Sequence, residues 1–417
     1  MRELLHTFGR IGVLSFGGPA AQIALMHKVL VDEKSWLSEK EFLSALSFSM
    51  LLPGPEAMQL ATYAGWRRGG VPGGLVAGGL FVLPGACVIL ALSIVYALFG
   101  AVPWVDALFL GVQATVVAIV LEALIKLARK AIRRPTDWAI AAASFVGIFA
   151  LSLPFPVIIA LAALWGALST RASPAVQVSA PPAPHALRKT GRTVLVWLAI
   201  WWLPVAALAL ANMPLLIDIA LFFSKLAVVT FGGAYAVLAY MTQTIVTDFG
   251  WITTGEMMDG LGLAETTPGP LILVTQFVGF LAGYNEAGMG MALLAALVTL
   301  WVTFIPCFLW IFAGAPYVER LLHMPRLSGA LNAVTAAVVG VILNLSLWFS
   351  AHVFFRQIET TTIGPFRLLS PVASSLDPLA TAIACVAAVL LLALKLGIGR
   401  TLLAGAAMGM ISLYPFT

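Results

Sequence analysis

The sequence contains few charged residues. Asp, Glu, Lys and Arg make up 10% of its 417 residues, whereas a soluble domain averages about 25%. With 61% hydrophobic residues, the chain lacks the polar groups that a soluble surface requires, so the soluble classes are excluded. A formal net charge of +5 is small for this length and does not by itself indicate a nucleic-acid partner.

Residues suited to redox or metal chemistry are also scarce. The three cysteines, Cys87, Cys307 and Cys385, lie in apolar stretches and are typical of small buried hydrophobes, not of a disulfide framework. The five histidines are scattered without metal-ligand spacing. There is no phosphate-binding loop and no Gly-x-Ser-x-Gly nucleophile motif. We therefore expect neither a metal nor a cofactor, and no enzyme activity. A membrane enzyme acting on a phosphorylated lipid would need an acid–base pair that the sequence does not offer.

Long apolar runs are abundant instead. A membrane-spanning helix needs roughly 20 such residues. Runs of sufficient length occur at residues 75–99, 107–125, 137–169, 193–211, 289–314 and 329–349. They predict a multi-pass, all-α integral membrane protein. The N-terminus lacks the short apolar segment and cleavage site of a signal peptide, so we expect none to be removed.

The chain contains an internal repeat. Phe16-Gly17-Gly18 and Phe231-Gly232-Gly233 lie 215 residues apart, and so do Pro53-Gly54-Pro55 and Pro268-Gly269-Pro270. The same offset relates Arg10 to Lys225, Trp36 to Trp251 and Glu41 to Glu256, and after an insertion near residue 285 it becomes 222. Agreement over so many positions predicts two copies of one unit. We expect a first repeat at 1–170, a cytoplasmic linker rich in Pro, Ala and basic residues at 171–192, a connecting span at 193–211 and a second repeat at 212–417.

The distribution of basic residues predicts that the copies are inverted. In copy one they flank Pro-Gly-Pro and follow the run at 107–125 in KLARKAIRRP, whereas the matching loops of copy two hold one arginine between them. The bias reverses at the next loop, AVPWVDA against ERLLHMPR. Because short basic loops stay cytoplasmic, the two copies should face opposite ways. Inverted repeats with broken helices are typical of secondary transporters.

Two interruptions in each copy indicate where a substrate would bind. Helical segments of about 12 residues on each side of Pro53-Gly54-Pro55 are too short to span, so we expect a re-entrant hairpin with this tripeptide at its tip. The Phe-Gly-Gly break is either a second hairpin or one broken span. Helices should restart near Ala20, Glu56, Ala234 and Leu271, and their free N–H groups together would form an anion site.

Polar residues near the breaks are the candidate ligands. Arg10 and Lys225 would compensate an anion, since charge inside a membrane is costly and usually functional or paired; the alternative is that they reach toward the interface or pair with Glu3 or Asp218. Four amides, Gln22, Gln59, Gln113 and Gln276, are candidates to donate N–H groups to a substrate or to a neighbouring helix. Glu56 either caps a helix or handles protons, and Glu265 is a similar proton candidate. Glu122 and Lys126 are expected to form a surface pair.

Several long strings of the sequence resemble the chromate ion transporters of bacteria in their long, two-domain form. They are FGRIGVLSFGGPAAQIALMHK, LLPGPEAMQLATYAGW and AGGLFVLPG in copy one, and VTFGGAYAVLAYM and TTPGPLILVTQFVGFLAGY in copy two. The resemblance covers nearly the whole chain. It implies an inner-membrane carrier that exports chromate and confers chromate resistance, with sulfate as a related oxyanion.

Together the breaks, the tips and this resemblance define an expected substrate site. Its residues are Arg10, Phe16, Gly17, Gly18, Pro19, Gln22, Pro53, Gly54, Pro55, Gln59, Lys225, Phe231, Gly232, Gly233, Thr267, Pro268, Gly269, Pro270 and Gln276. Alternatives are an anion channel or a transporter of sulfate or another oxyanion. The expected partners are the oxyanion and the lipid bilayer, without nucleic acid, and a homodimer is compatible with the sequence.

The inversion predicts a labelling pattern. Cysteines introduced at Ala131 and at Thr361 follow matching helices of the two copies, so membrane-impermeant thiol reagents should label them from opposite faces of the membrane. Labelling of both from the same face would exclude the inversion.

Overall fold

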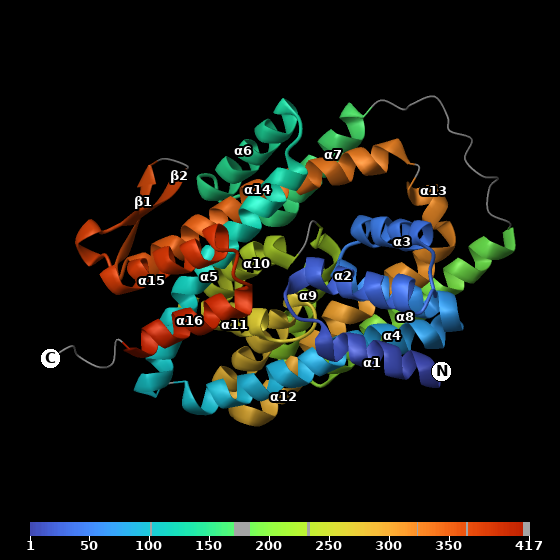
Figure 1. The fold of residues 1–417 in the computed structure, drawn as a ribbon, viewed down its shortest axis with the longest axis horizontal. Helices are drawn as coiled ribbons and strands as arrows, with labels where there is room; N and C mark the ends of the chain where they lie inside the picture. The colour runs from blue at the N-terminus through green and yellow to red at the C-terminus, as the bar shows by residue number, and fades with distance from the viewer. Residues whose placement is uncertain (101, 171–183, 232–233, 323, 364–365, 412–417) are drawn as a thin grey trace. The chain divides into compact units, whose positions relative to one another are not determined.

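The computed structural model describes residues 1–100, 102–170, 184–231, 234–322, 324–363 and 366–411. Within these ranges the chain is almost entirely helical, and the strands form a single two-stranded hairpin (Figure 1). Helices long and apolar enough to cross a membrane are Glu56–Phe99, Pro103–Ala131, Arg188–Leu210, Leu271–Tyr317 and Pro325–Phe354. The prediction of an all-α membrane protein is confirmed.

The chain divides into two compact units. The first comprises residues Met1–Ser93, Thr170–Ala234 and Thr267–Ser328. Its elements are α1 (Arg2–Leu14), α2 (Gly18–His27), η1 (Lys28–Glu33), α3 (Glu39–Leu51), most of α4 (Glu56–Phe99), α8 (Pro184–Leu210), α9 (Pro214–Val229), η3 (Leu271–Leu273), α12 (Val274–Gly314), η4 (Ala315–Tyr317) and α13 (Val318–Leu322). Both Pro-Gly-Pro tips and the ends of both helices that precede the Phe-Gly-Gly breaks therefore belong to this unit.

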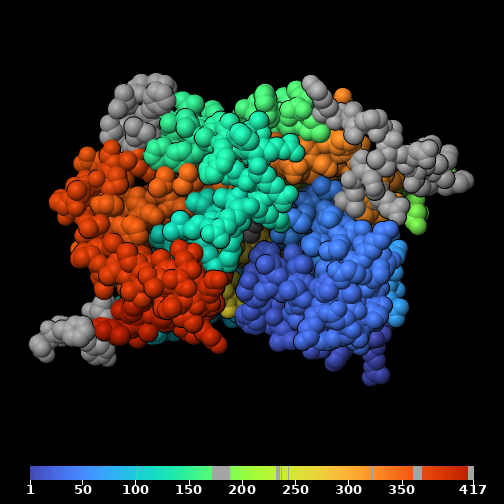
Figure 2. All heavy atoms as spheres, turned by 45° about the horizontal axis from the view of Figure 1, so that its top comes forward, coloured from blue at the N-terminus to red at the C-terminus, as the bar shows by residue number. Residues whose placement is uncertain are grey.

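The second unit comprises residues Ile94–Ser169, Tyr235–Thr266 and Gly329–Thr417. Its elements are α5 (Pro103–Ala131), α6 (Pro135–Phe149), α7 (Phe155–Ser169), α10 (Ala234–Thr242), η2 (Gln243–Phe249), α11 (Thr254–Thr266), α14 (Pro325–Phe354), β1 (Ile358–Ile363), β2 (Phe366–Pro371), η5 (Ala373–Ser375), α15 (Pro378–Ala388), η6 (Val389–Ala393) and α16 (Ile398–Ile411). Helices α15 and α16 pack on α5, and their red surface adjoins teal residues in Figure 2. Backbones approach closely where Gly111 meets Gly405.

The first arms of the two hairpins begin with the same N-terminal signal. At α3 the Ser38 hydroxyl accepts the N–H of Glu41 at 3.3 Å, and the Glu41 carboxylate accepts the Ser38 N–H at 3.0 Å. At α11 the Thr253 hydroxyl and Glu256 exchange the corresponding bonds, at 3.2 and 2.7 Å. Each pair is a capping box, which satisfies two helix donors at once. The acids that the repeat aligned are therefore helix starters.

Both long helices that follow the tips are broken. Helix α4 leaves helical geometry at Gly69 and Gly70, and α12 does so at Ala287 and Gly288, with φ of +61° at Gly70 and +75° at Gly288. Glycine adopts such angles at little steric cost. Each break leaves a short arm after the tip and a longer apolar segment beyond it. The first arms, α3 and α11, have 13 residues each, close to the predicted length.

One of the long apolar runs is divided between two helices. The apolar run at 137–169 forms two helices, α6 and α7, of 15 residues each. The chain turns between them at Ser152, where φ is +51°. Pro154 explains the interruption, because a proline disfavours helical geometry at the residue before it and cannot donate its own N–H.

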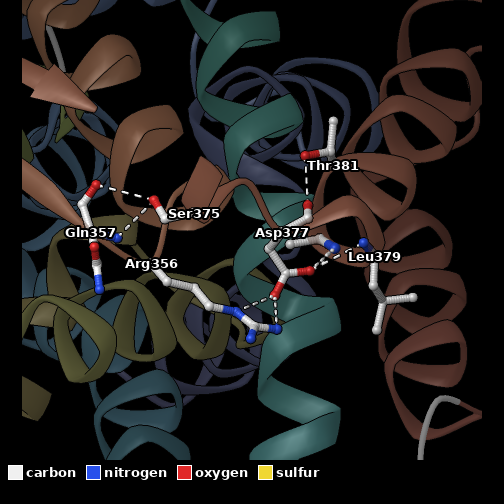
Figure 3. Close-up of polar contacts among 7 residues, drawn as sticks. Arg356, Gln357, Ser375, Asp377, Leu379 and Thr381 are labelled. Atoms are coloured by element: carbon white, nitrogen blue, oxygen red, sulfur yellow. Dashed lines mark hydrogen bonds and ion pairs between the residues drawn. The ribbon is translucent and has the colours of Figure 1, made fainter. Parts of the chain in front are cut away.

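A small polar cluster joins the β-hairpin to α15 (Figure 3). Asp377 is the N-cap of α15: its Oδ1 accepts the N–H groups of Leu379 and Ala380, both at 3.1 Å. Its Oδ2 accepts two N–H bonds from the Arg356 guanidinium, at 3.2 and 2.8 Å. Burial alone would raise the pKa of Asp377, but the Ala380 N–H and Arg356 outweigh it, and the pKa lies below its usual value.

The stability that is lost on replacing this N-cap should depend on pH. Asp377→Ala should lower the free energy of unfolding by about 1 kcal/mol at neutral pH, the typical cost of a lost cap. A lowered folded-state pKa contributes stability above the ordinary Asp value, near pH 4, and loses it as the pH falls through the folded-state value. Thermal unfolding in detergent should therefore separate variant and wild type at pH 7 and bring them together in acid. A difference independent of pH would contradict the assignment.

Candidate functional site

Each Pro-Gly-Pro tip turns the chain between two helices. Gly54 lies between α3 and α4 with a φ of +118°, and Gly269 lies between α11 and η3 with a φ of +92°. Side chains with a Cβ rarely adopt such angles, so both tips require glycine. The flanking prolines have no N–H group. The glycine N–H is therefore the backbone donor that each tripeptide offers.

The two glycine N–H groups donate to the helix breaks of the opposite halves of the sequence. Gly54 donates to the carbonyl oxygen of Thr230 at 2.9 Å, and Gly269 donates to that of Ser15 at 2.8 Å. Ser15 and Thr230 directly follow α1 and α9, and both are buried. Because lipid cannot satisfy a carbonyl that has left its helix, each break depends on the tip of the other half.

Each tip also packs on the long helix of the opposite half. A Cβ at Gly85 of α4 would lie 2.1 Å from the carbonyl oxygen of Pro268, and a Cβ at Gly54 would lie 2.9 Å from Sγ of Cys307 in α12. The absence of side chains at these glycines permits the approach. Each tip is thus held between a helix break and a long helix.

Three buried glutamines donate to backbone carbonyls around the tips. Gln22 Nε2 lies 2.6 Å from the Gly269 oxygen and 3.3 Å from the Ser15 oxygen. Gln59 and Gln276 donate to the carbonyls of Pro53, at 2.7 Å, and Ala86, at 3.1 Å. The Oε1 atoms of all three side chains are buried and lack a hydrogen-bond partner. In this structure the amides of Gln22 and Gln59 therefore bind tip carbonyls, whereas Gln276 binds the neighbouring helix α4, the alternative that the sequence left open.

A small cavity lies where the tips and the breaks meet. Its volume is about 10 Å³, room for about one water molecule. It is lined by Pro19, Gln22, Gly54, Pro55, Glu56, Ala57, Thr230, Pro270, Leu271 and Ile272. Residues from the first turns of α2 and α4 and from η3 line it together, so three of the four predicted helix starts converge on one space.

The remaining predicted break and tip residues lie at varied depths. Pro268 and Gly269 are buried with Thr267, whereas Pro53 is half-buried. Gly17 and Gly18 have φ of +86° and +76° and lead into α2. Phe16 exposes half of its side chain and Phe231 is half-buried. Gly232 and Gly233 lie outside the described residues.

The structure does not bring the two predicted cations into this cavity. Arg10 is on the exposed side of α1, and its Nη1 lies 3.2 Å from the Glu33 carboxylate. Of the partners proposed from the sequence, Glu3 instead lies 3.3 Å from Lys34. Lys225 is exposed on α9. Sequence reasoning placed both cations near the breaks, but it did not predict the ion pair between Arg10 and Glu33 of η1.

The candidate acids have different surroundings. Glu56 begins α4 and lines the cavity. Glu265, near the end of α11, is buried and accepts a hydrogen bond from the Tyr235 hydroxyl within the second unit. Glu122 and Lys126 form the predicted i,i+4 pair, at 2.6 Å. Among the described residues, no group of three or more His, Cys, Asp or Glu side chains is placed to hold a metal ion.

Sequence reasoning missed three contributors. Ser15 and Thr230 act through their backbone carbonyls, and the repeat offset that relates them is the signal that marks them. Asp259 is a buried carboxyl on α11 that receives the amide of Gln113. Gln113 therefore binds a side chain of a neighbouring helix, the alternative that the sequence left open.

Comparison with known proteins points to one family. The chain matches the family described as "Chromate transporter" over residues 2–167 and 217–410. It is 32% identical over 371 residues to a probable chromate transport protein of Synechococcus elongatus, covering 89% of each chain. It is 32% identical over 369 residues to a chromate transport protein of Pseudomonas aeruginosa, covering 87% of this chain and 84% of the relative. It is 31% identical over 345 residues to the chromate transport protein of Cupriavidus metallidurans, covering 82% of this chain and 80% of the relative. No solved structure matches the chain.

The crowding at the first tip predicts a difference between two glycine substitutions. Gly54 and Gly250 both have positive φ, but a Cβ at Gly250 would meet nothing within 4 Å. Both alanine variants bear the cost of left-handed backbone, about 1–2 kcal/mol. Gly54→Ala should lose roughly 1–3 kcal/mol more because of overpacking against Gln59 and Cys307. Thermal unfolding in detergent measures both losses, and equal losses would show that the tip tolerates a side chain.

Proposed function

The chain belongs to the chromate transporter family, and from that premise we propose that it exports chromate and confers chromate resistance. The protein is a multi-pass α-helical protein of the bacterial plasma membrane, and its family transports an oxyanion. The observation that carries the proposal is the cavity shared by the breaks and tips of both halves. Its position at interrupted helices suits a transporter substrate site.

The chemistry of the cavity suits an oxyanion. Chromate presents four acceptor oxygens, and helix starts present N–H groups with a partial positive charge. In this structure the N–H groups of Gly54 and Gly269 donate to the Thr230 and Ser15 carbonyls. We propose that chromate oxygens take the place of these carbonyls when the cavity opens. The glycines let the backbone reach the ion without an intervening side chain.

The size of the cavity requires the site to open before an oxyanion can enter it. A space of about 10 Å³ cannot hold chromate, a tetrahedral ion of one chromium and four oxygen atoms. Substrate binding must therefore separate the tips from the breaks, and alternating contacts of this kind are the mechanism of a carrier. A channel would instead provide a continuous path. Saturable chromate flux in proteoliposomes supports the carrier, whereas single-channel currents would support the alternative.

The proposed inverted repeat draws support from matching elements. Helices α3 and α11 start at Glu39 and Thr254, and α5 and α14 start at Pro103 and Pro325, at the offsets found in the sequence. We propose repeats at 1–170 and 212–417, joined by the linker at 171–192 and the span at 193–211, which corresponds to α8. The tip-to-break bonds occur once in each direction, as a two-fold relation between the halves requires.

The membrane potential supplies enough energy for export. Moving one charge through 100 mV is worth about 2.3 kcal/mol, so a dianion leaving a negative interior gains about 4.6 kcal/mol. Glu56 lines the proposed site, and its carboxylate would repel a dianion. We propose that Glu56 is protonated or displaced when chromate binds. Glu265 is the second proton candidate. We propose that the cavity between the tips and the breaks also selects between chromate and sulfate.

Uptake of chromate into inverted membrane vesicles tests the function. Vesicles that contain the protein should take up chromate in a saturable manner when the potential is imposed, and vesicles without it should not. Competition with sulfate and molybdate measures selectivity. Uptake of sulfate with no chromate uptake would assign the chain to the alternative oxyanion.

The ion pair of Arg10 offers a matched pair of variants. If Arg10 leaves Glu33 to contact the substrate, Arg10→Gln should weaken chromate uptake roughly tenfold or more, since a hydrogen bond to a charged group is worth about 1.5–3 kcal/mol. Glu33→Gln should then retain or increase uptake, because it releases the guanidinium. Lys225→Gln should resemble Arg10→Gln.

Protein abundance in the vesicles is the control for each variant. Equal losses in Arg10→Gln and Glu33→Gln would make the pair structural and remove Arg10 from the proposed site.

A further inference from the structure

The second unit contains a buried carboxyl that the proposed substrate site does not use. Asp259 on α11 exposes 5% of its surface. Its Oδ2 accepts the Tyr96 hydroxyl at 2.7 Å, and its Oδ1 accepts Nε2 of Gln113 at 2.8 Å. Tyr96 lies near the end of α4 and Gln113 on α5, so one side chain joins three helices. Helix α11 approaches α5 closely where Gly262 meets Val112.

No cation compensates this carboxyl among the described residues whose charges act on it. The charged groups that act on Asp259 are Asp106 on α5 and Glu256 on α11, and both are acids. The other helix packed on α11 is α16, whose one charged residue, Arg400, is exposed in its first turn. A carboxylate removed from water without a cation is costly, and it gains its neutral form by binding a proton.

The partners of Asp259 accommodate both protonation states. With the carboxylate ionised, Tyr96 and Gln113 each donate one hydrogen bond. When a proton forms an O–H bond at Oδ2, that group donates to the Tyr96 oxygen, because a hydroxyl is both donor and acceptor. Glu265 has different neighbours: the Tyr235 hydroxyl donates to it, the Glu122 carboxylate repels its charge and the Lys126 ammonium group attracts it.

We propose that Asp259 is a reversible proton-binding site of the transporter. It takes a proton from water on one side of the membrane and releases it to water on the other side during the transport cycle. Helix α11 leads directly into the tip at 267–270, so a change in how α11 is held against α4 and α5 reaches the tip along the chain. This coupling rests on the proposed function, whereas proton binding itself does not.

The first half of the sequence lacks a matching acid. The residue 215 positions before Asp259 is Ser44, and those matching Tyr96 and Gln113 at the offset of 222 are Val318 and Thr335. The cluster of Asp259, Tyr96 and Gln113 therefore has no counterpart at the positions related by the sequence offsets.

Infrared difference spectroscopy of the purified protein in nanodiscs tests proton binding directly. A pH titration of the wild type should show the carbonyl stretch of a protonated carboxyl appearing as the pH falls. Asp259→Asn should remove one component of this signal and leave the components of the other carboxyls, Glu265 among them. Asp106→Asn, which removes an exposed acid on α5, should retain the Asp259 component. Should Asp259→Asn fail to fold, Tyr96→Phe carries the test, because loss of its hydroxyl should shift the frequency and the midpoint of the signal.

Chromate uptake into inverted vesicles tests the coupling. In the wild type and in Asp106→Asn, an imposed pH gradient should change the rate of uptake at constant potential. In Asp259→Asn this response should disappear while uptake driven by the potential remains. An unchanged infrared signal in Asp259→Asn, or in Tyr96→Phe where that variant carries the test, would overturn the proposal, as would an undiminished gradient response. If chromate is not transported at all, the infrared titration still decides on proton binding, and only the proposed function fails.

Discussion

Backbone groups that leave helical geometry inside a membrane must find partners within the protein, because lipid offers none. This requirement shapes the first unit. The Ser15 and Thr230 carbonyls emerge where α1 and α9 end, and the N–H groups of Gly54 and Gly269 meet them from the opposite halves. Neither half can satisfy its own break in this arrangement. Two backbone hydrogen bonds, one donated by each half of the sequence to the other, thus satisfy both breaks.

The composition of the interrupted segments follows from the same requirement. Glycine occupies the tips because the turn needs positive φ, and proline flanks it because a residue without an N–H adds no further unsatisfied donor. Gln22 donates to two carbonyls that the tip and the break leave available. The same groups are the ones an oxyanion would compete for. In the proposed mechanism the tip-to-break bonds and substrate binding use the same donors, so the ion would open the site as it binds.

Sequence reasoning located the helix starts more accurately than the side-chain partners. The predicted restarts near Ala20, Glu56, Ala234 and Leu271 lie within two residues of the starts of α2, α4, α10 and η3, because the Gly and Pro signals that mark them are local. The capping boxes at Glu41 and Glu256 were not predicted, since the sequence offset only aligned these two acids. The partner of Arg10 could not be predicted, since Glu33 lies 23 positions away on η1, beyond the whole of α2. Asp259 was missed for a related reason: an isolated acid in a short helix carries no local signal of the Tyr96 hydroxyl 163 positions away. The split of 137–169 was readable at Pro154, but the continuous apolar run concealed it.

The central claim is that the oxyanion binds where the tips of both halves meet the breaks. A crystal structure of the protein with chromate, in which the chromium is located by its anomalous signal, tests it most directly. The account predicts chromium among Pro19, Gly54, Thr230 and Pro270, with the Gly54 and Gly269 N–H groups turned from the carbonyls of Thr230 and Ser15 toward the ion. Chromium bound elsewhere while both tip-to-break bonds remain intact would contradict it.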